Sequence, residues 1–156
     1  MIKPHLKQGR MNKMRKVIIF LTFAFVFLTL TSCGNRDIQG IEVSEILLIA
    51  SKSQNIDYRK LLNKAIKGDD TSIKQLALLE ISGGASAYDH GAVLVDLIEK
   101  IGEEMFINSV GSLTDSQTVL IRGSIEAGLE YGDNPSFHNK KIDDAFPQLC
   151  EFLNSQ

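Results

Sequence analysis

Hydrophobic residues recur at helical spacing along most of the chain from residue 41 to residue 156. Seven such segments are separated by polar or glycine-containing turns. Five of the segments begin at a residue of the kind that caps a helix, namely Ser44, Asp57, Asp70, Ser86 and Thr114. The pattern predicts an all-α fold.

The first three segments differ in how clearly they predict a helix. Residues 43–50 are apolar on most faces, which predicts a central helix, and so short a run is also compatible with a strand. Residues 57–66 form a clear helical stripe that ends at Gly68. The next segment runs from Asp70 until Ser82–Gly84 breaks the pattern, and we expect it to pack antiparallel to its predecessor.

The fourth segment begins at Ser86, which we expect to be its N-cap, with Asp89 at the third helical position. There the negative charge meets the positive end of the helix dipole. Gly102 ends this helix, and residues 103–110 form a short fifth one.

Thr114 and Gln117 have the spacing of a capping box for a sixth helix, which runs through Tyr131. The last helix is expected to start near Asp144, with Pro147 at its third position, where a missing N–H breaks no helical bond.

Small residues inside two helices predict close helix packing. Gly91 lies in the fourth segment, and Gly123 and Ala127 are four residues apart in the sixth. We expect each to let a neighbouring helix approach. Together the segments predict a compact bundle, or a short array, of about six to seven short helices in one domain, 41–156, which is long enough to bury its own core.

The N-terminal region has a different character. Residues 1–16 contain six basic residues and no acidic one, and residues 17–30 are apolar without a charge. A helix of this apolar length covers roughly 21 Å, less than the hydrocarbon core of about 30 Å. Residues 1–32 therefore have the organisation of a cleaved secretory signal, for which Met1, Met11 and Met14 are alternative starts.

The residues that follow the apolar run are Leu30-Thr31-Ser32-Cys33-Gly34. They resemble the lipobox of bacterial lipoproteins, in which an aliphatic residue and two small residues precede a cysteine. The resemblance implies cleavage before Cys33, a diacylglyceryl group on its thiol and an acyl group on the new N-terminus. It covers the signal only. Residues 33–40 would then be the lipidated cysteine and a short tether, and two or more acyl chains give a stable membrane anchor.

Processing would change the composition of the chain. Six of the 17 basic residues precede Cys33 and all 19 acidic residues follow it, so the mature chain has 11 basic residues and a net charge of −8. This charge argues against nucleic acid and anionic lipid as partners, because both are polyanions. Cys150 would remain the one free thiol, and we expect it to be a small core residue.

One short polar cluster is a candidate site, namely Tyr88, Asp89 and His90. Neighbouring residues on a helix do not face each other, so Asp89 and His90 cannot form a relay on their own. His90 precedes Leu94 by four residues, which places it on the buried stripe and favours a core histidine. The sequence shows no metal-binding set, no phosphate-binding loop and no nucleophile motif, and it implies no cofactor beyond the lipid on Cys33.

These features favour a lipid-anchored cell-envelope protein with a helical domain that binds another protein. A basic partner would suit its charge, and an inhibitor or immunity-type protein is a specific form of the hypothesis. The alternatives are a lipid-anchored hydrolase that uses His90, with Tyr88 or Glu126, and an envelope assembly or maintenance factor. Gly34 differs from the aspartate that retains some lipoproteins at the inner membrane, which favours the outer membrane.

The lipid anchor is directly testable. Replacing Cys33 with Ala should abolish incorporation of a fatty-acid probe into the protein, because the acceptor thiol is lost. Labelling that stays unchanged would contradict the lipobox prediction.

Overall fold

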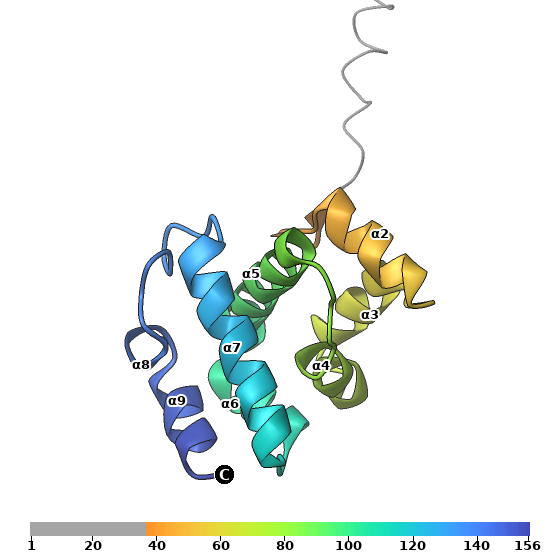
Figure 1. The fold of residues 1–156 in the computed structure, drawn as a ribbon. Coiled ribbons are helices and arrows are strands. Elements are labelled where there is room, and N and C mark those ends of the chain that lie inside the picture. The colour runs from red at the N-terminus through yellow and green to blue at the C-terminus, as the bar shows by residue number, and fades with distance from the viewer. Residues whose placement is uncertain (1–36) are drawn as a thin grey trace, which may run out of the picture. The chain divides into compact units, whose positions relative to one another are not determined.

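The fold is built around one long central helix. In the computed structural model, residues 37–156 are described, and the prediction for residues 1–32 and the lipidation of Cys33 lie outside them. Figure 1 shows α5 (Gly84–Ile101) in the middle, with α2 (Glu45–Ser53), α3 (Tyr58–Ala65) and α4 (Asp70–Ala77) on one side of it. The other helices are α6 (Glu103–Val110), α7 (Asp115–Tyr131), α8 (Ile142–Ala145) and α9 (Pro147–Asn154). The all-α prediction is confirmed.

The described chain begins with a small hairpin. Strand β1 (Asp37–Ile38) pairs antiparallel with β2 (Ile41–Glu42), and Ile41 is buried. The prediction that residues up to 40 form a plain tether is therefore wrong for Asp37–Gly40. A strand of two residues is too short to produce a periodic pattern in the sequence, so the hairpin could not be predicted. Its turn is made by Gln39 and Gly40, both at positive φ.

Helix α2 begins where the sequence predicted, and the Ser44 Oγ accepts a hydrogen bond from the Leu47 N–H at 3.1 Å. Its predicted central position is wrong. Leu47 and Ser51 are its only fully buried residues, and Ile46 and Ile49 are 55% and 64% exposed. The apolar run covers more faces of the helix than the core contacts.

Helices α3 and α4 form and pack against each other, and Asp57 caps α3 as expected. The cap of α4 is Asp69 rather than the predicted Asp70, which is the first residue of the helix. Helix α4 ends earlier than predicted, at Ala77 rather than near Ser82. The Leu79 N–H bonds to the Leu76 carbonyl in a tighter turn, and the chain after it is not helical until α5. This non-helical stretch brings Ile81 into the core.

The predicted start of the fourth helix is wrong. Helix α5 begins at Gly84 rather than after Ser86, because Gly83 at φ 106° turns the chain directly into the helix. Ser86 instead lies in the first turn, where its hydroxyl donates to the carbonyl oxygens of Ser82 and Gly83. Asp89 is consequently too far along the helix to meet its positive end.

The C-terminal segment forms two helices rather than one. A residue before proline avoids helical backbone angles, and Phe146 accordingly has φ −139° and ψ 73° between α8 and α9. Pro147 is therefore the first residue of α9 and not the third of a longer helix. The start of α9 is capped from another helix, since Glu103 accepts a hydrogen bond from the Leu149 N–H at 2.8 Å. Cys150 is partly buried against the core.

The capping box of α7 is confirmed, with Thr114 and Gln117 bonding reciprocally. Helices α5 and α7 pack together more extensively than any other pair of elements in the described residues. A Cβ on Gly91 would stand 2.2 Å from the Ser124 carbonyl oxygen, and a Cβ on Gly128 would stand 2.2 Å from the Gly91 carbonyl oxygen. The predicted role of Gly91 is thus confirmed, and Gly128 is its partner.

The same role predicted for Gly123 is wrong, because no atom lies within 4 Å of the place a Cβ would occupy. Among the described residues, no helix is both long and apolar enough to cross a membrane.

The glycine contact gives a matched pair of variants. Replacing Gly128 with Ala should lower the free energy of unfolding in urea by about 3 kcal/mol, because the added methyl group overlaps the backbone of α5. Replacing Gly123 with Ala, on the same helix, should raise it by up to about 1 kcal/mol, because alanine stabilises a helix interior. Equal effects of the two substitutions would contradict this packing.

Candidate functional site

The three residues predicted as a polar cluster point in three directions. Tyr88 is 44% exposed, and its ring stacks on Tyr131 of α7 with 4.4 Å between centroids. Asp89 accepts a hydrogen bond from the Ser44 hydroxyl at the start of α2. His90 is 2% exposed and faces α3. The structure therefore does not assemble Tyr88, Asp89 and His90 into one site, and no Asp89–His90 relay forms.

His90 is a core residue, as its place on the buried stripe predicted. Its Nδ1 lies 2.7 Å from the Tyr58 hydroxyl. Burial, with a smaller contribution from the charge of Asp89, raises the pKa of Tyr58 well above its usual value, so the phenol keeps its proton. Because Tyr58 has a proton to donate and no other acceptor is recorded for it among residues 37–156, we assign Nδ1 as the acceptor, which places the imidazole proton on Nε2.

The Nε2 atom is buried without a hydrogen-bond partner among the described residues. The backbone carbonyl of Leu76 interacts with His90 and raises its pKa, although no acceptor meets hydrogen-bond geometry at Nε2. Burial is the stronger influence and lowers the pKa of His90 to about 4. His90 is therefore neutral at pH 7.

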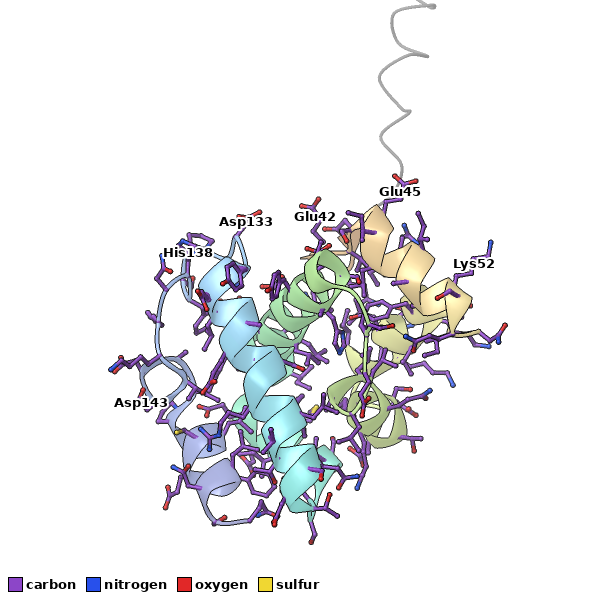
Figure 2. All side chains as sticks on the ribbon, in the orientation of Figure 1. Glu42, Glu45, Lys52, Asp133, His138 and Asp143 are labelled. Carbon is purple, nitrogen blue, oxygen red and sulfur yellow. The ribbon has the colours of Figure 1, made fainter. Side chains whose placement is uncertain are left out.

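An acidic cavity of about 600 Å³ lies beside the α5–α7 contact. Five carboxylates and one lysine line it, contributed by β2, α5 and the chain after α7: Glu42, Asp89, Asp96, Glu99, Lys100 and Asp133. Figure 2 shows Glu42 and Asp133 at the same end of the domain. The excess of negative charge in a concave site favours a cationic ligand.

Two of these carboxylates are held by one amide. Asn134 Nδ2 donates to Asp96 Oδ1 and to Glu99 Oε2, both at 2.8 Å. The Ser136 N–H donates to Asn134 Oδ1 at 3.0 Å, which fixes the orientation of the amide. Desolvation, together with the nearby charge of Glu99, raises the pKa of Asp96 against the opposing effect of Asn134.

The loop that carries Asn134 is itself held in place. The Asn139 N–H donates to the Leu129 carbonyl at 2.8 Å, and His138 Nδ1 lies 2.8 Å from the Gly132 carbonyl oxygen. Sequence reasoning missed this cavity because its residues come from segments up to about ninety positions apart. The available signal was the spacing of Asp96 and Glu99, two acids on one helix face.

A second cavity, of about 470 Å³, is mostly apolar and is lined in part by Tyr88 of the stacked pair. Its lining comes from α5, α7 and the chain between α4 and α5, and includes Ile81, Ala87, Tyr88, His90, Val119, Leu120, Gly123 and Ala127. Val119 is 70% exposed. Each tyrosine of the pair lines one of the two cavities, Tyr131 the acidic one and Tyr88 the apolar one.

Comparison with known protein families, with curated proteins and with solved structures finds no match to this chain. Among residues 37–156, no group of three or more His, Cys, Asp or Glu side chains is arranged to hold a metal ion.

The neutral state of His90 predicts a pH-dependent stability. The unfolded chain binds a proton at this histidine below about pH 6.5, whereas the folded chain does so only near pH 4. The stability that His90 contributes is therefore complete above pH 6.5 and is lost as the pH falls toward 4, by about 3 kcal/mol in total. Urea unfolding at a series of pH values measures it.

Replacing His90 with Gln removes the titrating group while keeping an amide that can bond Tyr58. The variant should lose less stability than the parent between pH 7 and pH 4.5. A parent and variant that lose stability in parallel would show that other groups cause the effect.

Proposed function

We propose that this protein is a lipid-anchored component of the cell envelope whose helical domain binds a basic segment of a protein partner in the acidic cavity. The cavity between α5, β2 and the chain after α7 is the observation that supports the binding role. Its volume of about 600 Å³ lies within the range of protein pockets that bind ligands. The anchor is supported by the resemblance of the sequence around Cys33 to a lipobox.

The charges explain why the ligand would be basic. Glu42, Glu99 and Asp133 are exposed at the cavity and would attract a cationic partner at long range. Asp96 is partly buried, so a lysine or arginine beside it would meet a carboxylate that is less well screened by water. An inhibitor or immunity-type role, directed at a basic exported protein, is one specific form of this proposal.

The alternative of a hydrolase that uses His90 gains no observation in its favour. His90 borders the apolar cavity, but its Nδ1 is taken by Tyr58, and Asp89 bonds to Ser44 instead. Glu126, suggested as a distant acid, lines neither of these cavities.

A carbodiimide, which joins carboxylates directly to amines, provides the test. We expect treated membranes to yield an adduct between this protein and a lysine of one basic partner, recovered by pull-down. Its yield should fall as salt is raised, because the attraction is electrostatic. An unrelated acidic lipoprotein is the background control.

Two charge-matched variants locate the contact. The combined change Glu42→Gln, Glu99→Gln and Asp133→Asn removes three exposed charges at the cavity and should abolish the adduct. The combined change Glu104→Gln, Asp143→Asn and Glu151→Gln removes three exposed charges elsewhere and should leave it; Figure 2 shows Asp143 away from Glu42 and Asp133. No partner above the background, or equal loss in both variants, would overturn the proposal.

A further inference from the structure

The apolar cavity contains a glycine that the fold itself does not explain. Gly123 lies inside α7, where glycine weakens a helix relative to alanine. Gly91 and Gly128 offset this cost by allowing the backbones of α5 and α7 to touch, but Gly123 faces open space. What its missing side chain provides is room in the cavity, beside the exposed Val119.

The stacked tyrosines relate the apolar cavity to the acidic one. Tyr88 lines the apolar cavity, Tyr131 lines the acidic one, and both residues are about half exposed. Exposed tyrosines are enriched where proteins bind one another, because they offer a large rigid surface with a polar tip. A chain segment lying across this pair would meet carboxylates on one side and apolar groups on the other.

We propose that the apolar cavity receives an apolar side chain from the same partner segment whose basic residue enters the acidic cavity. This inference rests on the proposed function and narrows the partner to a segment in which an apolar residue lies close to a lysine or arginine. The tyrosine pair lies under the segment between those two residues.

Photo-crosslinking of the full chain in the cells that produce it tests the inference. A benzoylphenylalanine is placed at one position at a time: Val119 in the apolar cavity, Tyr131 at the acidic cavity, or Ile49 on α2, which is exposed and lines neither cavity. Positions 119 and 131 should crosslink to the same partner, and position 49 should not. Mass spectrometry should place the two attachment points in one short stretch, with an apolar residue at the first and Lys or Arg near the second.

Filling the cavity should then remove one adduct selectively. Gly123→Leu places a side chain in the open space and should lower the yield of the position-119 adduct at least tenfold, whereas Gly123→Ala should change it less than threefold. Urea unfolding should show both variants to be at least as stable as the parent.

The outcomes separate the two proposals. A partner captured from position 131 but not from position 119, or a position-119 adduct that is indifferent to Gly123→Leu, would overturn the inference and leave the proposed function standing. Capture from neither position would overturn both. Capture of different proteins from the two positions would overturn the single-segment arrangement.

Discussion

The backbone contact between Gly91 and Gly128 is the constraint on which the rest of the domain depends. It lets α5 and α7 approach more closely than any pair of side chains would allow, and the elements of both cavities are arranged around that crossing. Tyr88 and Tyr131 stack because the two helices are so close. The sequence keeps these glycines despite their cost to each helix, which shows that docking outweighs local helix preference here.

Different faces of helix α5 contact the core and line the two cavities. One face packs into the core through Leu94, Leu97 and Ile98, and a second presents Asp96 and Glu99 to the acidic cavity. His90 belongs to the core and also borders the apolar cavity. A single central helix therefore contributes residues to the core and to both cavities.

Capping residues and hydrophobic spacing predicted most of the helices. The two cavities depend on contacts between residues far apart in the sequence, which such local patterns do not reveal. The caps at Ser44, Asp57 and Thr114 act over three residues and are visible in the sequence. The predicted cap at Ser86 is wrong because α5 begins directly after Gly83 without a side-chain cap. Gly123 and Gly128 lie on one helix, and only the position of α5 distinguishes the packed glycine from the open one. Asp96 and Asn134 meet through a loop whose path the pattern of residues does not specify.

The bond between Ser44 and Asp89 has a mechanical consequence. Ser44 caps α2 and also donates to a carboxylate of α5, so it joins the first helix to the central one. Helix α2 buries few side chains, and only a two-stranded hairpin precedes it in the described chain. A pulling force applied at the N-terminal side of Asp37 therefore loads the hairpin and the buried Ile41 and Val43 first and this hydrogen bond next, before it reaches the α5–α7 contact. The first helix can yield under tension while the α5–α7 contact stays intact.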